Sequence, residues 1–287
     1  MPELPEVEAL VAAVGERARG KRVARAQVVA FACLKTVEIP PSDLVGRVLT
    51  GAERHGKFLC FDLSGVWLVI HLAHAGWLTW RETAPAGPAA PGRGGLAFRL
   101  VFDDGSGFDL TEAGTQKSLA VHLVRRPGDV PRIATLGPEP LGDDFTPAEL
   151  GRILDAAGGA QLKGVLRDQR LLAGVGNAYS DEIAWAARLS PFAACGRLDD
   201  AARERLYEAI RTVLGTAVAH LASVDVSRLR SERRADFLVH GRTGQPCPAC
   251  GTPIEQVSFA ESSLQYCPTC QTRGRPLADR RLSRLLK

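Results

Sequence analysis

Two Cys-x-x-Cys pairs near the end of this 287-residue chain constrain its fold more than any other feature. Cys247 and Cys250 form the first pair, Cys267 and Cys270 form the second, and residues 251–266 separate the pairs. Four thiolates at this spacing can close a tetrahedral site around Zn²⁺ in which protein fills every ligand position. Disulfide bonds are the rival interpretation, but no secretion signal opens the chain. We therefore expect one structural zinc ion per chain.

The composition is typical of a globular protein of about two domains, since 45% of the residues are hydrophobic and 24% are charged. No apolar run is long enough to span a bilayer, so we expect a cytoplasmic protein without a membrane partner. The three single cysteines, Cys33, Cys60 and Cys195, are predicted to be buried thiols. The net charge is +4, yet residues 228–287 carry 11 Lys/Arg against 5 Asp/Glu. This basic quarter indicates a polyanion partner, or else solvated surface arginines.

The chain opens with the octapeptide Met1-Pro2-Glu3-Leu4-Pro5-Glu6-Val7-Glu8. Removal of Met1 would leave an N-terminal proline, whose secondary amine stands next to a carboxylate. Such an amine can attack an aldehyde-level carbon, and the adduct stays a cationic iminium because the nitrogen has no second proton to lose. Glu3 could then move protons to a leaving group. The structural alternative is that Pro5 and the carboxylates simply suit the first turn of a helix.

The first 130 residues are expected to form one helix and then short strands. Apolar residues recur with helical spacing over residues 5–16 and predict an amphipathic helix. Asp104-Gly105 is a hairpin turn signal, and the Pro-, Gly- and Ala-rich residues 83–95 predict a surface loop. Many short strands with turns between them favour a two-layer β-sandwich. The expected strands are residues 22–31, 47–50, 57–63, 66–72, 96–102 and 107–110.

The second half is expected to be helical, which makes the fold class α+β and multidomain. Thr146-Pro147-Ala148-Glu149 predicts a capped helix start, and apolar periodicity predicts helices over residues 177–188 and 200–221. The glycine-rich residues 171–179 run into a helix start, where backbone N–H groups can bind phosphate, although an ordinary tight turn also explains them. The expected parts are a β-sandwich over 1–130, a hinge over 131–145, a helical domain over 146–232, a zinc finger over 233–275 and a basic tail over 276–287.

In this order, the features resemble those of the formamidopyrimidine-DNA glycosylase/endonuclease VIII family, the helix–two-turn–helix DNA glycosylases. The resemblance rests on Pro2–Glu8, on Gly174–Glu182 and on the approach to the finger, His240–Cys247. It implies an N-terminal β-sandwich, a helix–two-turn–helix domain and a terminal zinc-finger β-hairpin. It also implies a monomeric, nucleoid-associated enzyme of base excision repair that acts on DNA as glycosylase and abasic-site lyase. The alternatives are a non-catalytic DNA- or RNA-binding protein on this fold, and an enzyme acting on small carbonyl compounds.

The resemblance also implies roles for individual residues. Pro2 would attack C1′ of the damaged nucleotide, Glu3 would move protons and Glu6 would support Glu3. Lys57 would hold a phosphate next to the lesion. On the second domain, Gly176, Asn177 and Lys163 would contact the DNA backbone.

Three positions depart from the family pattern. His74 stands where a gap-filling methionine is usual, and Glu112–Lys117 replaces the usual Arg-x-Phe loop. Ser262 stands where the finger usually carries an arginine that grips phosphate. His74 with Gln116 or Lys117 is the candidate substitute for the missing residues. We therefore expect DNA binding with an altered lesion or strand preference, supported in part by the six positive charges of residues 273–287.

Overall fold

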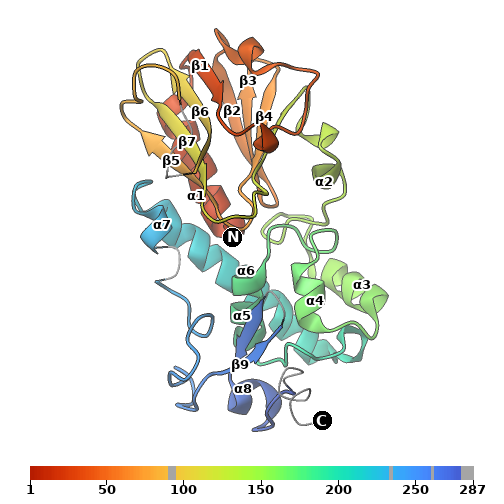
Figure 1. Cartoon of the computed structure of the whole chain (residues 1–287). Helices are drawn as coiled ribbons and strands as arrows, with labels where there is room; N and C mark the ends of the chain where they lie inside the picture. The colour runs from red at the N-terminus through yellow and green to blue at the C-terminus, as the bar shows by residue number, and fades with distance from the viewer. Residues whose placement is uncertain (90–94, 233–234, 260–261, 279–287) are drawn as a thin grey trace. The chain divides into compact units, whose positions relative to one another are not determined.

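The computed structural model describes residues 1–89, 95–232, 235–259 and 262–278, and its mixed α+β elements form two units (Figure 1). Unit 1 contains Met1–Leu136 and Val218–Arg233. Unit 2 contains Gly137–Ala217 and Arg234–Lys287. The long helix α6 (Asp200–Ala222) has its last turn and a half in unit 1 and the rest in unit 2.

Unit 1 is a β-sandwich of two four-stranded antiparallel sheets. One sheet has the order β1-β6-β7-β5 and the other has the order β2-β3-β4-β8. The buried faces of both sheets and the apolar stripe of α1 (Leu4–Ala18) form one hydrophobic core. The strands are β1 (Val23–Val28), β2 (Leu49–His55), β3 (Phe58–Leu63), β4 (Trp67–His71), β5 (Gly76–Arg81), β6 (Leu96–Phe102), β7 (Gly107–Glu112) and β8 (Ala120–Val124).

Several connections meet at one end of this sandwich. β4 ends at His71, which pairs with Phe58 at the start of β3 and with Ala120 at the start of β8. In the other sheet Gly76, at the start of β5, pairs with Glu112 at the end of β7. The N–H of Ala113 donates to the carbonyl of Ala75 at 3.2 Å and joins the two crossing connections. We call this the loop end; it comprises residues 29–33, 56–57, 72–75 and 113–119.

Short helices complete unit 1. Leu221, Val226 and Leu229 are buried in its core, because the end of α6 and the helix α7 return to the sandwich. The short helices are η1 (Phe31–Cys33), η2 (Pro41–Leu44), η3 (Pro127–Asp129), α2 (Pro131–Ala134) and α7 (Leu229–Glu232).

Unit 2 is built from helices and one hairpin. The side chain of Thr146 accepts the N–H of Glu149 at 3.2 Å and caps α3, as the sequence predicted. The apolar stripe of α6 faces the interior of this unit, where Leu206, Ile210 and Leu214 are fully buried. The elements are α3 (Pro147–Ala157), α4 (Leu162–Arg167), α5 (Asn177–Ala186), η4 (Cys195–Arg197), the hairpin strands β9 (Glu255–Ser258) and β10 (Ser263–Tyr266), and α8 (Pro268–Thr272).

The predicted fold class and architecture are confirmed, with differences in detail. Strands β5 and β8 were not predicted. β5 is mostly buried and lacks a clear alternation, and β8 has only five residues, too few for periodicity to identify a strand. The expected hinge begins with a helix, α2, and the contact division falls after Leu136. Residues 218–232, expected in the helical domain, group with unit 1. Among the described residues, no helix has the length and apolarity needed to cross a membrane.

Candidate active site and metal centre

The N-terminal residues proposed to be reactive are buried at the start of α1. Glu3 is the N-cap residue, and its backbone N–H donates to the carboxylate of Glu6 at 2.8 Å. Pro2 is buried, and Glu3 and Glu6 are each 3% exposed. Pro5 occupies the first turn, as the structural interpretation of the octapeptide predicts, and the chemical role of Pro2 and Glu3 stays a prediction. Buried acids beside the Pro2 position are suited to proton transfer.

An ion pair fastens the Lys57 turn to this helix. Nε of Arg54 donates to the carboxylate of Glu8 at 2.7 Å, and Nη1 of the same side chain donates to the carbonyl of Gly56 at 3.0 Å. Glu8 is only about four residues, or roughly 6 Å of helix, from the start of α1. No role was predicted for Arg54 or Glu8, although Glu8 belongs to the N-terminal octapeptide. This pair brings the turn that carries the buried Lys57 to the same end of α1 as Pro2 and Glu3.

A neutral histidine lies near Lys57. His71 ends β4 and is 7% exposed, with its ring 4.7 Å from that of Phe58. Burial, together with the positive charges of Arg132 and Lys57, lowers the pKa of His71 to about 3. At neutral pH this imidazole therefore adds no charge beside Lys57.

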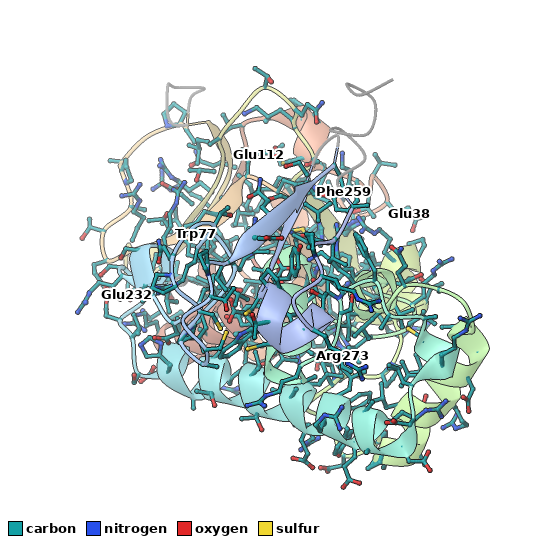
Figure 2. The ribbon with its side chains drawn as sticks, turned by 90° about the horizontal axis from the view of Figure 1, so that it is seen from below. Glu38, Trp77, Glu112, Glu232, Phe259 and Arg273 are labelled. Atoms are coloured by element: carbon teal, nitrogen blue, oxygen red, sulfur yellow. The ribbon has the colours of Figure 1, made fainter. Side chains whose placement is uncertain are left out.

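The residues that replace the usual gap-filling set lie on the loop end. His74 is exposed in the β4–β5 turn, and Gln116 and Lys117 are exposed in the β7–β8 loop. Glu112, labelled in Figure 2, is 3% exposed at the end of β7. Its carboxylate accepts the N–H of Ser118 at 2.7 Å and that of Leu119 at 2.9 Å. The loop is therefore held to the strand that precedes it.

The glycine-rich turn before α5 is shaped by one side chain. The amide oxygen of Gln169 accepts the N–H of Gly174 at 3.0 Å, and its nitrogen donates to the carbonyl of Val175 at 2.7 Å. Gly174 has a φ of 83°, which a residue with a Cβ rarely adopts. Asn177 then begins α5, and Gly176 is its N-cap. The turn and helix start that the sequence predicted as a phosphate site are both present.

Asn177 also contacts the hairpin. Its side-chain nitrogen donates to the carbonyl of Ser263 at 2.9 Å. Its side-chain oxygen is buried and has no hydrogen-bond partner among the described residues. Ser262, the next departure from the family pattern, lies in the β9–β10 turn, where its carbonyl accepts the N–H of Phe259 at 2.7 Å. The glycine-rich turn and the finger are thus joined through Asn177.

Lys163 is an internal residue of unit 2. Its ammonium group lies 2.5 Å from the carboxylate of Asp181, 3.0 Å from the hydroxyl of Ser180 and 3.1 Å from the carbonyl of Asn177. The residue is only 5% exposed. These partners fix the first turn of α5, so the direct phosphate contact expected of Lys163 has no geometric support and stays a prediction.

Two adjacent acids on α5 anchor the segment that leads into the finger. Asp181 lies 2.8 Å from Nδ1 of His240 and accepts the N–H of Gln265 at 3.3 Å. Glu182 accepts the N–H groups of residues 238–240 at 2.7–3.0 Å. Burial nevertheless raises the pKa of Glu182. No role was predicted for these two acids, although they stand next to each other at the end of the motif Gly174–Glu182.

The four paired cysteines form the metal centre. Their sulfur atoms all lie within 4.8 Å of one another, and the Cys250 and Cys267 sulfurs are 3.4 Å apart. A tetrahedral Zn²⁺ with Zn–S bonds of about 2.3 Å places its sulfurs roughly 3.8 Å apart, so the donor set fits a structural zinc ion. The indole N–H of Trp185, on α5, donates to the Cys247 sulfur at 3.3 Å. Such a bond favours the thiolate that a metal requires.

The remaining cysteines are buried thiols, as predicted. Burial raises the pKa of both Cys33 and Cys195 to about 11, which leaves them protonated at neutral pH. Of the six positive charges of residues 273–287, those of Arg273 and Arg275 are on described residues, and Arg273 follows α8 (Figure 2). Arg280, Arg281, Arg284 and Lys287 lie outside the described residues.

Three segments match known domain families. Residues 1–128 match the formamidopyrimidine-DNA glycosylase N-terminal domain. Residues 136–227 match the formamidopyrimidine-DNA glycosylase H2TH domain, and residues 244–273 match the zinc finger found in FPG and IleRS. Together the matches follow the order of the sandwich, the helical unit and the cysteine centre.

Relatives match over the whole chain as well. A formamidopyrimidine-DNA glycosylase of Symbiobacterium thermophilum is 36% identical over 292 residues, with 98% of this chain and 93% of that protein covered. The crystal structure of MutM (Fpg) from Thermus thermophilus has a TM-score of 0.80 and 33% identity, over 96% of this chain and 100% of that one. A Lactococcus lactis formamidopyrimidine-DNA glycosylase was solved non-covalently bound to DNA containing an abasic site. It has a TM-score of 0.82 and 26% identity, over 94% of this chain and 99% of that one.

Proposed function

This chain belongs to the formamidopyrimidine-DNA glycosylase family, and from that premise we propose that it is a bifunctional DNA glycosylase and abasic-site lyase. It removes a damaged base and then cleaves the strand at the abasic site. We propose that it works as a monomer on nucleoid DNA in the cytoplasm. Relatives named formamidopyrimidine-DNA glycosylase support this proposal, as does the related enzyme solved with abasic-site DNA.

One observation carries the proposed mechanism: the Pro2–Glu3 sequence is buried at the start of a capped helix, with the Lys57 turn fastened to that helix. Once Met1 is removed, the Pro2 nitrogen attacks C1′ of the nucleotide. The N-glycosidic bond breaks, and the departing base takes a proton that Glu3 delivers. A second proton, also relayed by Glu3, goes to the ring oxygen O4′, so that the C1′–O4′ bond breaks and the iminium forms. The iminium acidifies the C2′–H, and loss of that proton breaks the C3′–O bond and expels the 3′ phosphate.

The DNA backbone is held by groups that recognise phosphate without reading sequence. We propose that Lys57 contacts a phosphate near the lesion. In unit 2, Asn177 and the N–H groups that follow Gly176 contact a second phosphate at the start of α5. Lys163 supports these groups from behind through Asp181 and Ser180. Extrusion of the nucleotide gives the buried C1′ access to the amine.

The substrate preference follows from the loop end. Ala113–Ser118 contains no aromatic residue, so an extruded base leaves unstacked neighbours that this loop cannot fill. Ser262 also lacks the charge that would hold a phosphate beside the finger. We propose weak excision of 8-oxoguanine from duplex DNA, and better activity on abasic sites, oxidised pyrimidines or single strands.

Borohydride trapping tests the function. Protein with Met1 removed is incubated with an oligonucleotide containing an abasic site, and borohydride then reduces the iminium to a stable covalent adduct. We expect the adduct to map to Pro2 by mass spectrometry of tryptic peptides. Pro2→Gly retains a primary amine and is expected to trap weakly, and protein that keeps Met1 is expected not to trap.

Two outcomes contradict this proposal. An adduct formed equally well with Met1 retained would make a lysine the nucleophile. Tight binding of abasic DNA without any adduct, by protein whose Pro2 is free, would make the chain a non-catalytic nucleic-acid-binding protein on the same fold.

A further inference from the structure

Phe31 is an aromatic residue without a folding role. It lies in η1 and is 82% exposed, whereas the other phenylalanines of unit 1 are almost fully buried. An exposed phenylalanine leaves apolar surface in water that burial would otherwise stabilise. Cys33, two residues on, is the buried member of this turn and donates to the carbonyl of Ala97 at 3.6 Å. The turn is therefore anchored through Cys33, and the exposure of Phe31 does not arise from a loose segment.

The backbone places Phe31 on the loop end. On one side, the N–H groups of Val29 and Ala30 donate to the carbonyl of Ala97, beside the start of β6. On the other side, Leu34 bridges in parallel to Val121 near the start of β8. Phe31 is held between these two anchors. The start of β6 and the start of β8 both belong to the end that carries the His74 turn and the β7–β8 loop.

We propose that Phe31 stacks on a nucleobase that loses its neighbour when the damaged nucleotide is extruded. This inference rests on the proposed function and adds a specificity-determining residue to it. Aromatic rings stack on any base because every base has a π-face. The β7–β8 loop offers no such ring, and Phe31 supplies one from a different segment of the same end. Lys35, which is exposed four residues away, provides the positive charge that a nucleic acid favours and an apolar protein partner does not.

Val37 is a matched control for exposure. It is 88% exposed and lies on the same segment as Phe31. Its neighbour Thr36 accepts the N–H of Leu123, so Val37 lies further along β8 and away from its start at Ala120. Substitution of Val37 removes a similarly exposed apolar side chain without touching the loop end.

The test measures binding to an uncleavable DNA, so that it does not depend on catalysis. Phe31→Ala, Phe31→Trp and Val37→Ala are titrated with a duplex that carries a tetrahydrofuran abasic analogue and, next to it, 2-aminopurine. We expect Phe31→Ala to weaken binding about tenfold, near the lower end of the range for a stacked base. It is also expected to abolish the quenching of 2-aminopurine. Phe31→Trp should restore both, and Val37→Ala should match the unchanged protein.

The outcomes separate this inference from the proposed function. If Phe31→Ala binds and quenches as the unchanged protein does, the stacking role is wrong even when borohydride trapping succeeds. If trapping fails but the Phe31 variants still differ in binding, the catalytic proposal is wrong and the stacking role stands. An equal loss with Val37→Ala would show a general apolar contact, which also contradicts the proposal. Melting temperatures of all variants should agree, because both side chains are exposed.

Discussion

The ammonium nitrogen of Lys163 lies 2.5 Å from the carboxylate of Asp181, and both side chains are buried within unit 2. The same carboxylate reaches His240 and the backbone of Gln265, so one buried acid connects α4, α5, the segment leading into the finger and strand β10 of its hairpin. This position makes Lys163 a support for the first turn of α5. It also gives the first prediction.

We predict that Lys163→Met destabilises the protein by about 3–5 kcal/mol, because it leaves the carboxylate of Asp181 buried without its cation. Urea unfolding measures this loss. Arg167→Met is the control, since Arg167 is an exposed cation on the same helix and its removal should cost little. If Lys163→Met instead preserves stability and lowers the salt dependence of DNA binding by about one phosphate contact, Lys163 touches DNA directly.

A second prediction concerns Glu3. Glu3→Gln keeps the size of the side chain but cannot deliver a proton to the departing base. Base release should slow by about 100-fold or more, while cleavage of a preformed abasic site should change much less. Single-turnover assays on the two substrates measure the difference. Equal slowing of both steps would argue for a positional role of Glu3 at the helix start.

The metal centre gives a third prediction. Freshly purified, reduced protein should contain one zinc ion per chain, because the four sulfurs fit one tetrahedral ion. Cys267→Ser should lower the zinc content and the DNA affinity while the sandwich of unit 1 stays folded, as metal binding supplies the folding energy of so small a hairpin. Cys195→Ser is the matched control, since Cys195 is a buried thiol outside the metal set. Absence of zinc would overturn the assignment.

Glu112 gives a fourth prediction, about the loop end. Glu112→Ala removes the acceptor that holds the N–H groups of Ser118 and Leu119, so the loop should loosen. Amide hydrogen exchange of these two residues should accelerate, and trypsin should cut faster after Lys117. Glu112→Gln retains one acceptor oxygen, so its exchange rates are expected to lie between those of the unchanged protein and those of Glu112→Ala. Unchanged exchange in Glu112→Ala would mean that the loop is held by other contacts.

The fifth prediction concerns strand preference. Single-turnover cleavage is compared on matched single- and double-stranded oligonucleotides that carry 8-oxoguanine, an oxidised pyrimidine or an abasic site. We expect 8-oxoguanine opposite cytosine to be a slow duplex substrate, because unstacking costs a few kcal/mol per step and is smallest where pairing is already lost. A fast reaction on this duplex would mean that His74, Gln116 and Lys117 fill the gap effectively.

Local sequence determined much of this protein. The zinc ligands were predictable because four cysteines at two fixed spacings leave few other arrangements. The cap at Thr146, the helix behind Pro2 and the turn before Asn177 follow from residues next to one another in the chain, whose backbone preferences are local. The order of these features along the chain then carried the family resemblance.

Tertiary structure decided the rest, because it brings together residues that are distant in sequence. The sequence around Lys163 does not indicate that Asp181 neutralises its charge, and the sequence around Arg54 does not indicate that Glu8 is its partner. The return of residues 218–233 to unit 1 depends on the burial of Leu221 and Leu229 in a core formed by other segments. The exposure of Phe31 could not be predicted either, since a phenylalanine in a sequence is expected in the core and only the packed sandwich leaves it at the surface.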